Sequence, residues 1–150
     1  MIHKVIEGDC EEQLDLMKDF DFFEGIHLTF LDPPFNQDKK YRHHDDNMPE
    51  EEYWAWMKRV IKKIFDNTVE GGAIYFMQRE KNTEFVLNTL RETGWTFQNL
   101  ITWNKMTSAI PSKYRFSKKF QIIAYFTKGK RPRVFNNLRY EPNLLAMHEY

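Results

Sequence analysis

The sequence contains a single cysteine, Cys10, and no hydrophobic run long enough to cross a bilayer. One cysteine excludes a framework of intramolecular disulfides and fits a reducing compartment. The first residues lack both the apolar segment of a secretory signal and the basic amphipathic pattern of an organellar presequence. We therefore expect a cytoplasmic protein with no membrane anchor. Its 150 residues suit one domain with a core of its own.

Acidic residues are absent between positions 105 and 133, although the net charge of the chain is zero. By contrast, residues 1–52 are strongly acidic. A basic segment without acidic residues suits a polyanion, because each neutralised phosphate releases counterions. The solvated surface of an ordinary domain would look the same, so charge alone leaves both interpretations open. The basic residues of this segment are Lys105, Lys113, Arg115, Lys118, Lys119, Lys128, Lys130, Arg131 and Arg133.

Segments with strand and helix patterns alternate along the chain. Strands are predicted at 2–6, 26–31, 73–77, 95–103 and 120–127, and helices at 11–18, 49–67 and 81–93. The apolar run at 26–31 is typical of a strand buried in a parallel sheet. The alternation predicts a three-layer α/β domain with a largely parallel sheet. The apolar face of the helix at 49–67 comprises Tyr53, Met57, Val60, Ile61 and Ile64.

Asp32-Pro33-Pro34-Phe35 follows the apolar run directly, where a strand should end. Functional groups gather at the carboxyl ends of strands in open α/β sheets. Two consecutive prolines fix the backbone and withdraw two donors, so the turn is stiff. It can present a carboxylate, a carbonyl and an aromatic ring to a flat base with an exocyclic amine. A base in a duplex would have to be flipped out to reach it. The alternative is a plain strand-ending turn with Phe35 in the core.

Six segments follow one another in an order that is more specific than any single motif. In chain order they are Gly8-Asp9, Leu31-Asp32-Pro33-Pro34-Phe35-Asn36, Gly71-Gly72-Ala73-Ile74-Tyr75-Phe76, Ile101-Thr102-Trp103-Asn104-Lys105, Lys113-Tyr114-Arg115-Phe116-Ser117 and Ile122-Ile123-Ala124-Tyr125-Phe126-Thr127-Lys128. This order resembles the permuted (β-group) amino-group DNA methyltransferases over about residues 4–140. The resemblance implies a Rossmann-like fold, double-stranded DNA as substrate, S-adenosylmethionine as cofactor, and a role in restriction–modification.

The resemblance also implies roles for individual positions. Asp9, Cys10 and Asp32 would contact S-adenosylmethionine. The turn from Asp32 to Phe35 would hold the target amine, and its initial Asp favours adenine N6 over cytosine N4. Phe116 would be the second aromatic face of the base pocket, unless it only anchors its loop. Further contacts to the base or to DNA are expected from Asn36, Lys113, Arg115, Lys118 and Lys119.

Two departures from the family pattern matter. Many members have a glutamate where this chain has Gln121. The glycine-rich cofactor loop, which comes near the C-terminus in the permuted order, is missing, because none of the six glycines forms a Gly-x-Gly. We therefore expect one partial domain over residues 1–150, the catalytic half of an incomplete methyltransferase fold. A second polypeptide or a homodimer would complete it, or the chain is an inactive truncated relic.

Other functions stay open at this stage. The chain could be a non-catalytic DNA-binding or assembly subunit, or a methyltransferase acting on RNA bases. His43-His44-Asp45-Asp46 contains good metal ligands, but adjacent loop residues rarely converge on one ion. We predict no metal site there and instead a mobile loop over the base pocket. Cys10 is not predicted to be a nucleophile, because methylation of an amine needs no covalent adduct.

Overall fold

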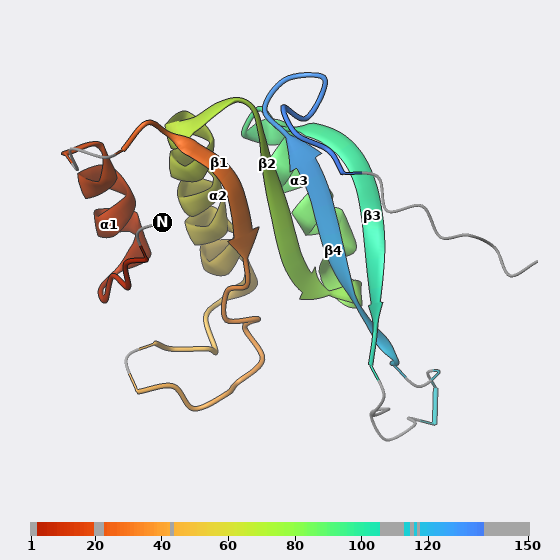
Figure 1. Cartoon of the computed structure of the whole chain (residues 1–150). Helices are drawn as coiled ribbons and strands as arrows, with labels where there is room; N and C mark the ends of the chain where they lie inside the picture. The colour runs from red at the N-terminus through yellow and green to blue at the C-terminus, as the bar shows by residue number, and fades with distance from the viewer. Residues whose placement is uncertain are drawn as a thin grey trace, which may run out of the picture.

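The computed structural model describes residues 3–19, 23–42, 44–105, 113, 114, 116 and 118–136. Its elements are α1 (Cys10–Leu16), η1 (Met17–Asp19), β1 (Ile26–Leu31), α2 (Glu50–Asn67), β2 (Thr68–Arg79), η2 (Glu80–Asn82), α3 (Thr83–Glu92), β3 (Thr96–Asn104) and β4 (Phe120–Thr127) (Figure 1). All three predicted helices are present. The predicted strand at 2–6 is not formed over residues 3–6, which have no described strand to pair with. No helix in the described ranges is long and apolar enough to span a membrane.

The strands form one mixed sheet in the order β1-β2-β4-β3. β1 is parallel to β2, whereas β4 is antiparallel to both β2 and β3. The α/β class is as predicted, but two of these three pairings are antiparallel where a largely parallel sheet was expected. A parallel pair needs a long crossover, usually a helix, while antiparallel neighbours can be joined directly. The described residues between β3 and β4 contain no such helix.

Helices α2 and α3 lie on the same face of the sheet, behind it in Figure 1, and the core lies between them and the strands. The apolar residues predicted for one face of α2 are all buried, which confirms that face. They pack with the β2 and β4 residues that point to the same side. The central members of this core are Tyr53, Met57, Ile61, Ile74, Phe76, Ile122 and Phe126.

The opposite face of the sheet carries no helix in the described part of the chain (Figure 1). Leu28 and Phe30 of β1 are 62% and 57% exposed there. The strand at 26–31 was expected to be buried on both faces, as in a three-layer domain. It is half-open instead, because it lies at the sheet edge and helices cover only one side.

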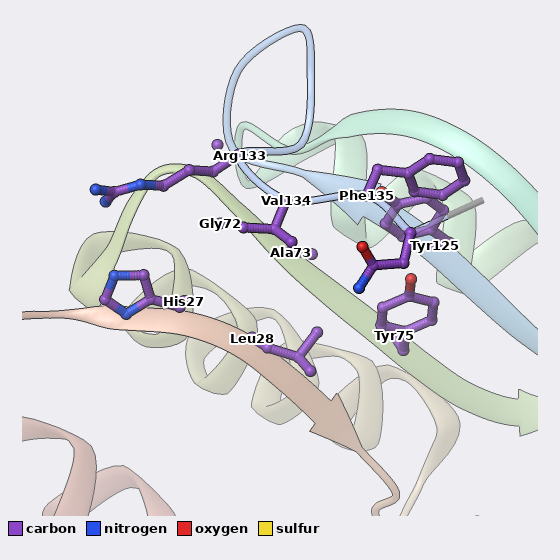
Figure 2. Close-up of a pocket in the computed structure, with 11 residues that line it drawn as sticks. His27, Leu28, Gly72, Ala73, Tyr75, Tyr125, Arg133, Val134 and Phe135 are labelled. Carbon is purple, nitrogen blue, oxygen red and sulfur yellow. The ribbon is translucent and has the colours of Figure 1, made fainter. Parts of the chain in front are cut away.

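The open face is hollowed over β1, β2 and β4 to about 360 Å³ (Figure 2). Tyr75 stacks on Tyr125 with ring centroids 4.6 Å apart, and Phe135 lies 6.4 Å from Tyr125 on its other side. The segment after β4 reaches this place by folding back over the start of β2. There Arg133 donates its backbone N–H to the Gly71 carbonyl at 2.7 Å, and the positive φ of Gly71 permits the approach.

The two faces of the sheet should respond differently to the loss of a phenylalanine ring. Phe76 has no exposed surface, so Phe76→Ala should lower the free energy of unfolding by about 3–5 kcal/mol. Phe30→Ala should cost less than about 1 kcal/mol, because its ring is largely solvated. Urea denaturation followed by circular dichroism measures both. Equal losses would show that the open face is covered within the chain.

Candidate active site

The loop Asp32-Pro33-Pro34-Phe35 leaves β1 at its carboxyl end. Asp32 is exposed, whereas Phe35 is buried. The Tyr53 hydroxyl of α2 donates to the Pro34 carbonyl at 2.7 Å, and in turn accepts a bond of 2.8 Å from the Gln78 side-chain amide of β2. Burial raises the pKa of Tyr53, so the hydroxyl keeps the proton that it donates. Two core residues thus fix the second proline of the loop.

Asp46 holds the residues that follow the prolines. Its carboxylate is buried and accepts backbone N–H bonds from Asn36 at 2.8 Å, Gln37 at 3.1 Å and Lys39 at 3.0 Å. Burial alone would raise the pKa of this carboxyl group. The three N–H donors outweigh burial and lower it below its ordinary value. Asp46 is therefore ionised at neutral pH and organises residues 36–39.

Asn36 has a positive φ and both ends of its side chain engaged. Its amide donates to the Met48 carbonyl at 2.7 Å and its oxygen accepts the Met48 N–H at 2.8 Å. The predicted contact of Asn36 with base or DNA stays a prediction, but in this structure the side chain closes the loop. The loop that contains the histidine–aspartate segment lies beside the prolines, and these bonds tie its two ends together.

Asp32, Pro33 and Pro34 form a wall shared by two cavities. The first, about 370 Å³, lies at the end of the open sheet face. The second, about 690 Å³, lies toward α2 and the N-terminal segment. The first is also lined by Phe35, Lys39, Tyr41, Met77, Trp103 and Gln121, and the second by Gly8, Asp9, Cys10, His44, Trp56 and Met57 among others. One rigid loop can therefore contact two different ligands at once.

Comparison of the sequence with known proteins identifies the family of this chain. The N6/N4 family model described as DNA methylase matches residues 26–149. The chain belongs to this family of DNA methylases. The family match includes both the proline loop and the strands that carry the two cavities.

Two characterised relatives show how much of a whole enzyme is present. The type II methyltransferase M1.MboII of Moraxella bovis is 28% identical over 133 residues, which are 86% of this chain and 47% of the relative. The DNA adenine methyltransferase YhdJ of Escherichia coli (strain K12) is 24% identical over 132 residues, 88% of this chain and 43% of the relative. The matched residues thus cover less than half the length of either relative.

Solved structures confirm the Rossmann-like methyltransferase fold. The cytosine-N4-specific PvuII DNA methyltransferase superposes with a TM-score of 0.58 at 17% identity, covering 80% of this chain and 48% of that structure. The M1.HpyAVI complex with S-adenosylmethionine gives a TM-score of 0.58 at 17% identity, covering 91% and 60%. At this identity the likeness establishes the fold alone.

The residues predicted on the cofactor side, Asp9, Cys10 and Asp32, all line the larger cavity of this methylase chain. The Asp9 carboxylate also caps α1, accepting the Glu11 N–H at 2.8 Å. Partial burial of the thiol, followed by the Asp9 and Glu11 carboxylates, raises the pKa of Cys10. A raised pKa favours the protonated thiol. That Cys10 is not a nucleophile stays a prediction.

The basic residues predicted to contact DNA differ in their surroundings. Lys118 is paired with Glu80 at 2.7 Å, with both side chains partly buried. Lys113 and Lys119 are exposed, and Arg115 lies outside the described residues. Phe116 is 99% exposed and is not among the residues lining the smaller cavity. Its role as a second aromatic face stays a prediction that this arrangement does not favour.

Several residues at the site carry no sequence signal strong enough to find them. Tyr41 and Trp103 line the smaller cavity, and Asp46 and Gln78 support its loop. Gln78 could have been noticed as an amide at the end of an apolar strand. The others require the folded backbone, because they come from a loop and from a strand distant in sequence.

The histidine–aspartate segment does not form a metal site in the described residues. No group of three or more His, Cys, Asp or Glu side chains there could hold an ion. His43 lies outside the described ranges. His44 packs its ring 5.2 Å from Trp56, Asp45 accepts the Asn47 N–H, and Asp46 binds the loop backbone.

Asp46→Asn should loosen the loop, because an amide nitrogen would then face backbone N–H donors. We expect a loss of about 1.5–3 kcal/mol in the free energy of unfolding at pH 7. The folded pKa of Asp46 is lowered, so its contribution is complete above about pH 4 and is lost as the pH falls through the folded value. The difference between the wild type and the variant should therefore shrink in acid.

Asp45→Asn is the matched control, since Asp45 is exposed and accepts a single local N–H. It should cost less than about 0.5 kcal/mol. Urea titrations of both variants at neutral and acidic pH provide the comparison. Equal effects of the two substitutions would contradict the role given to Asp46.

Proposed function

We propose that this chain is the catalytic half of a DNA methyltransferase that transfers a methyl group from S-adenosylmethionine to the exocyclic amine of a flipped base. The observation that carries the proposal is the shared wall of Asp32, Pro33 and Pro34 between two cavities. A methyl transfer needs a donor and an acceptor in contact at one point. The proline loop is where two such ligands would meet.

The larger cavity suits the cofactor. Its lining combines the acidic side chains of Glu7 and Asp9 with the apolar side chains of Leu31, Met57 and Val60. Carboxylates accept hydrogen bonds from ribose hydroxyls and from an adenine amine, while apolar side chains pack on the ring. S-Adenosylmethionine, once bound there, supplies an electrophilic methyl group. Because the chain has no Gly-x-Gly, these residues hold only part of such a ligand.

The smaller cavity suits the base. The Asp32 carboxylate and the Pro33 carbonyl would accept hydrogen bonds from the exocyclic amine, orienting its nitrogen lone pair away from them. The Pro34 carbonyl is less available, because it already accepts the Tyr53 hydroxyl. A base within a duplex cannot reach this loop, so the target must be extruded from the stack.

We propose adenine N6 rather than cytosine N4 as the target. The support is the residue before the two prolines, Asp32, which is the residue that the resemblance associates with adenine. M1.MboII, the matched relative with the higher identity of the two described above, is named only as a type II methyltransferase, while YhdJ is named as an adenine enzyme. The PvuII structure, named as cytosine-N4-specific, shares the fold at lower identity.

We further propose that a second polypeptide completes this single partial domain. The supporting observations are the apolar open face with Leu28 and Phe30, and the outer edge of β1, which pairs with no strand in the described residues. An unpaired edge strand and an uncovered apolar face are both poorly suited to water. The relatives that match have about as much chain again beyond the matched part. A partner with the missing half of the fold could cover both.

Asp32→Ala should abolish methyl transfer because it removes the main acceptor for the target amine. The assay is transfer of labelled methyl groups to DNA by the chain reconstituted with a completing half, or by a chimera in which it replaces the matching segment of M1.MboII. Asp66→Ala, an exposed change on α2, is the control and should leave transfer unchanged. Full transfer by Asp32→Ala with an unaltered fold would refute the assignment.

Loss of an exposed basic side chain should weaken DNA binding more than loss of a paired one. Lys119→Ala should weaken DNA binding. It should also lower the slope of the logarithm of the binding constant against the logarithm of the salt concentration by about one phosphate contact. Lys113→Ala should do the same. Lys118→Ala should have a smaller effect, because its ammonium group is bound to Glu80. Fluorescence anisotropy over a salt series measures both quantities. Unchanged slopes for Lys113 and Lys119 would exclude this segment from the interface.

A further inference from the structure

We propose that Trp103 and Tyr41 are the aromatic walls that hold the target base beside Asp32 and select planar bases over other groups. This inference rests on the proposed function and goes beyond it by naming the residues that grip the base. Both side chains line the cavity of about 370 Å³ that the proline loop borders. They come from separate parts of the chain, β3 and the loop after β1.

The position of Trp103 is set by the sheet. It lies opposite Gln121 of β4, which in turn lies opposite Arg79 at the end of β2. Opposed residues of antiparallel strands point to the same face, so Trp103 stands on the open face. Although β3 lies at the opposite edge of the sheet from β1, the Trp103 side chain lines the same cavity as the proline loop. Trp103 is 50% exposed, whereas Trp95, which directly precedes the same strand, is buried. A large ring left half-solvated beside a cavity is available for stacking.

Tyr41 lies on a loop that is held by backbone hydrogen bonds. Lys40 and Asp45 form an isolated antiparallel bridge, and Asp38 donates its N–H to the Asp46 carbonyl at 2.8 Å. The His44 ring lies edge-on to Tyr41 at 6.0 Å. Tyr41 is nevertheless 45% exposed. The Asp46 contacts that hold residues 36–39 therefore also help to position this second ring.

Polar side chains that line the cavity could form hydrogen bonds with the edge of a base. Gln121 carries a side-chain amide that can both donate and accept, and Lys39 is a donor. Bound bases are read by hydrogen bonds to their edges while aromatic groups cover their faces. The combination favours a planar heterocycle with an exocyclic amine over a sugar or a phosphate.

The test uses two short oligonucleotides with identical backbones, one entirely abasic and one with a single adenine in the middle. Backbone contacts are the same in both, so the ratio of their dissociation constants isolates what the chain gains from one base. We expect the adenine to tighten binding about tenfold, as one base–aromatic stack can. Trp103→Ala and Tyr41→Ala should bring this ratio toward one, and Trp103→Phe should keep most of it.

Phe116→Ala tests the rival prediction that Phe116 is an aromatic face of the base pocket, because Phe116 is exposed and is not among the residues that line this cavity. It should leave the ratio unchanged. A ratio that survives Trp103→Ala, or that disappears with Phe116→Ala instead, overturns the assignment of the walls but leaves the proposed function standing. Failure of the wild type to bind either oligonucleotide counts against nucleic acid as the substrate, and so against both proposals.

Discussion

The backbone N–H bonds accepted by the buried Asp46 carboxylate are the interaction on which the site depends. They hold the residues after the two prolines, while the Tyr53 hydroxyl holds the Pro34 carbonyl from the opposite side. The exposed Asp32 lies between the end of β1 and these anchors, and the two prolines that follow it restrict the backbone. In the proposed function, such preorganisation would help Asp32 to accept the amine, because the cost of ordering the loop is met during folding rather than at binding.

The same loop joins two regions with different surroundings. On one side lie the N-terminal segment and α2, which offer acidic and apolar groups. On the other lies the end of the open sheet face, with half-exposed aromatic rings. The open face continues from there across β1, β2 and β4, where Tyr75, Tyr125 and Phe135 stack. In the described part of the chain, helices cover only one face of the sheet, and the proline loop lies at the end of the open face.

Much of this could be predicted from sequence because the signals are local. Helical periodicity located α2 and its buried face, and the Asp-Pro-Pro-Phe turn located the loop. Strand direction was not predictable in the same way, since it depends on which strands pair across β4. An apolar run such as 26–31 looks alike whether both faces are buried or one is open.

The walls and anchors of the site could not be predicted because they depend on distant contacts. Trp103 reaches the proline loop only through the pairing of β3 with β4, and Gln78 has a partner only when α2 packs on β2. Asp46 was considered as a metal ligand on the basis of its histidine neighbours. Its actual partners are backbone N–H groups, and such contacts cannot be recognised from the amino-acid sequence.

The central claim, that one proline loop serves two adjoining ligands, is tested most directly by nuclear magnetic resonance of the isotopically labelled chain. S-Adenosylhomocysteine should shift the amide signals of Asp9, Cys10 and Asp32. An adenine-bearing abasic oligonucleotide should instead shift Tyr41, the Trp103 indole and, again, Asp32. Shifts of Asp32 with both ligands, and otherwise separate sets, are the predicted result. Overlapping sets, or an Asp32 signal that neither ligand moves, would contradict the account.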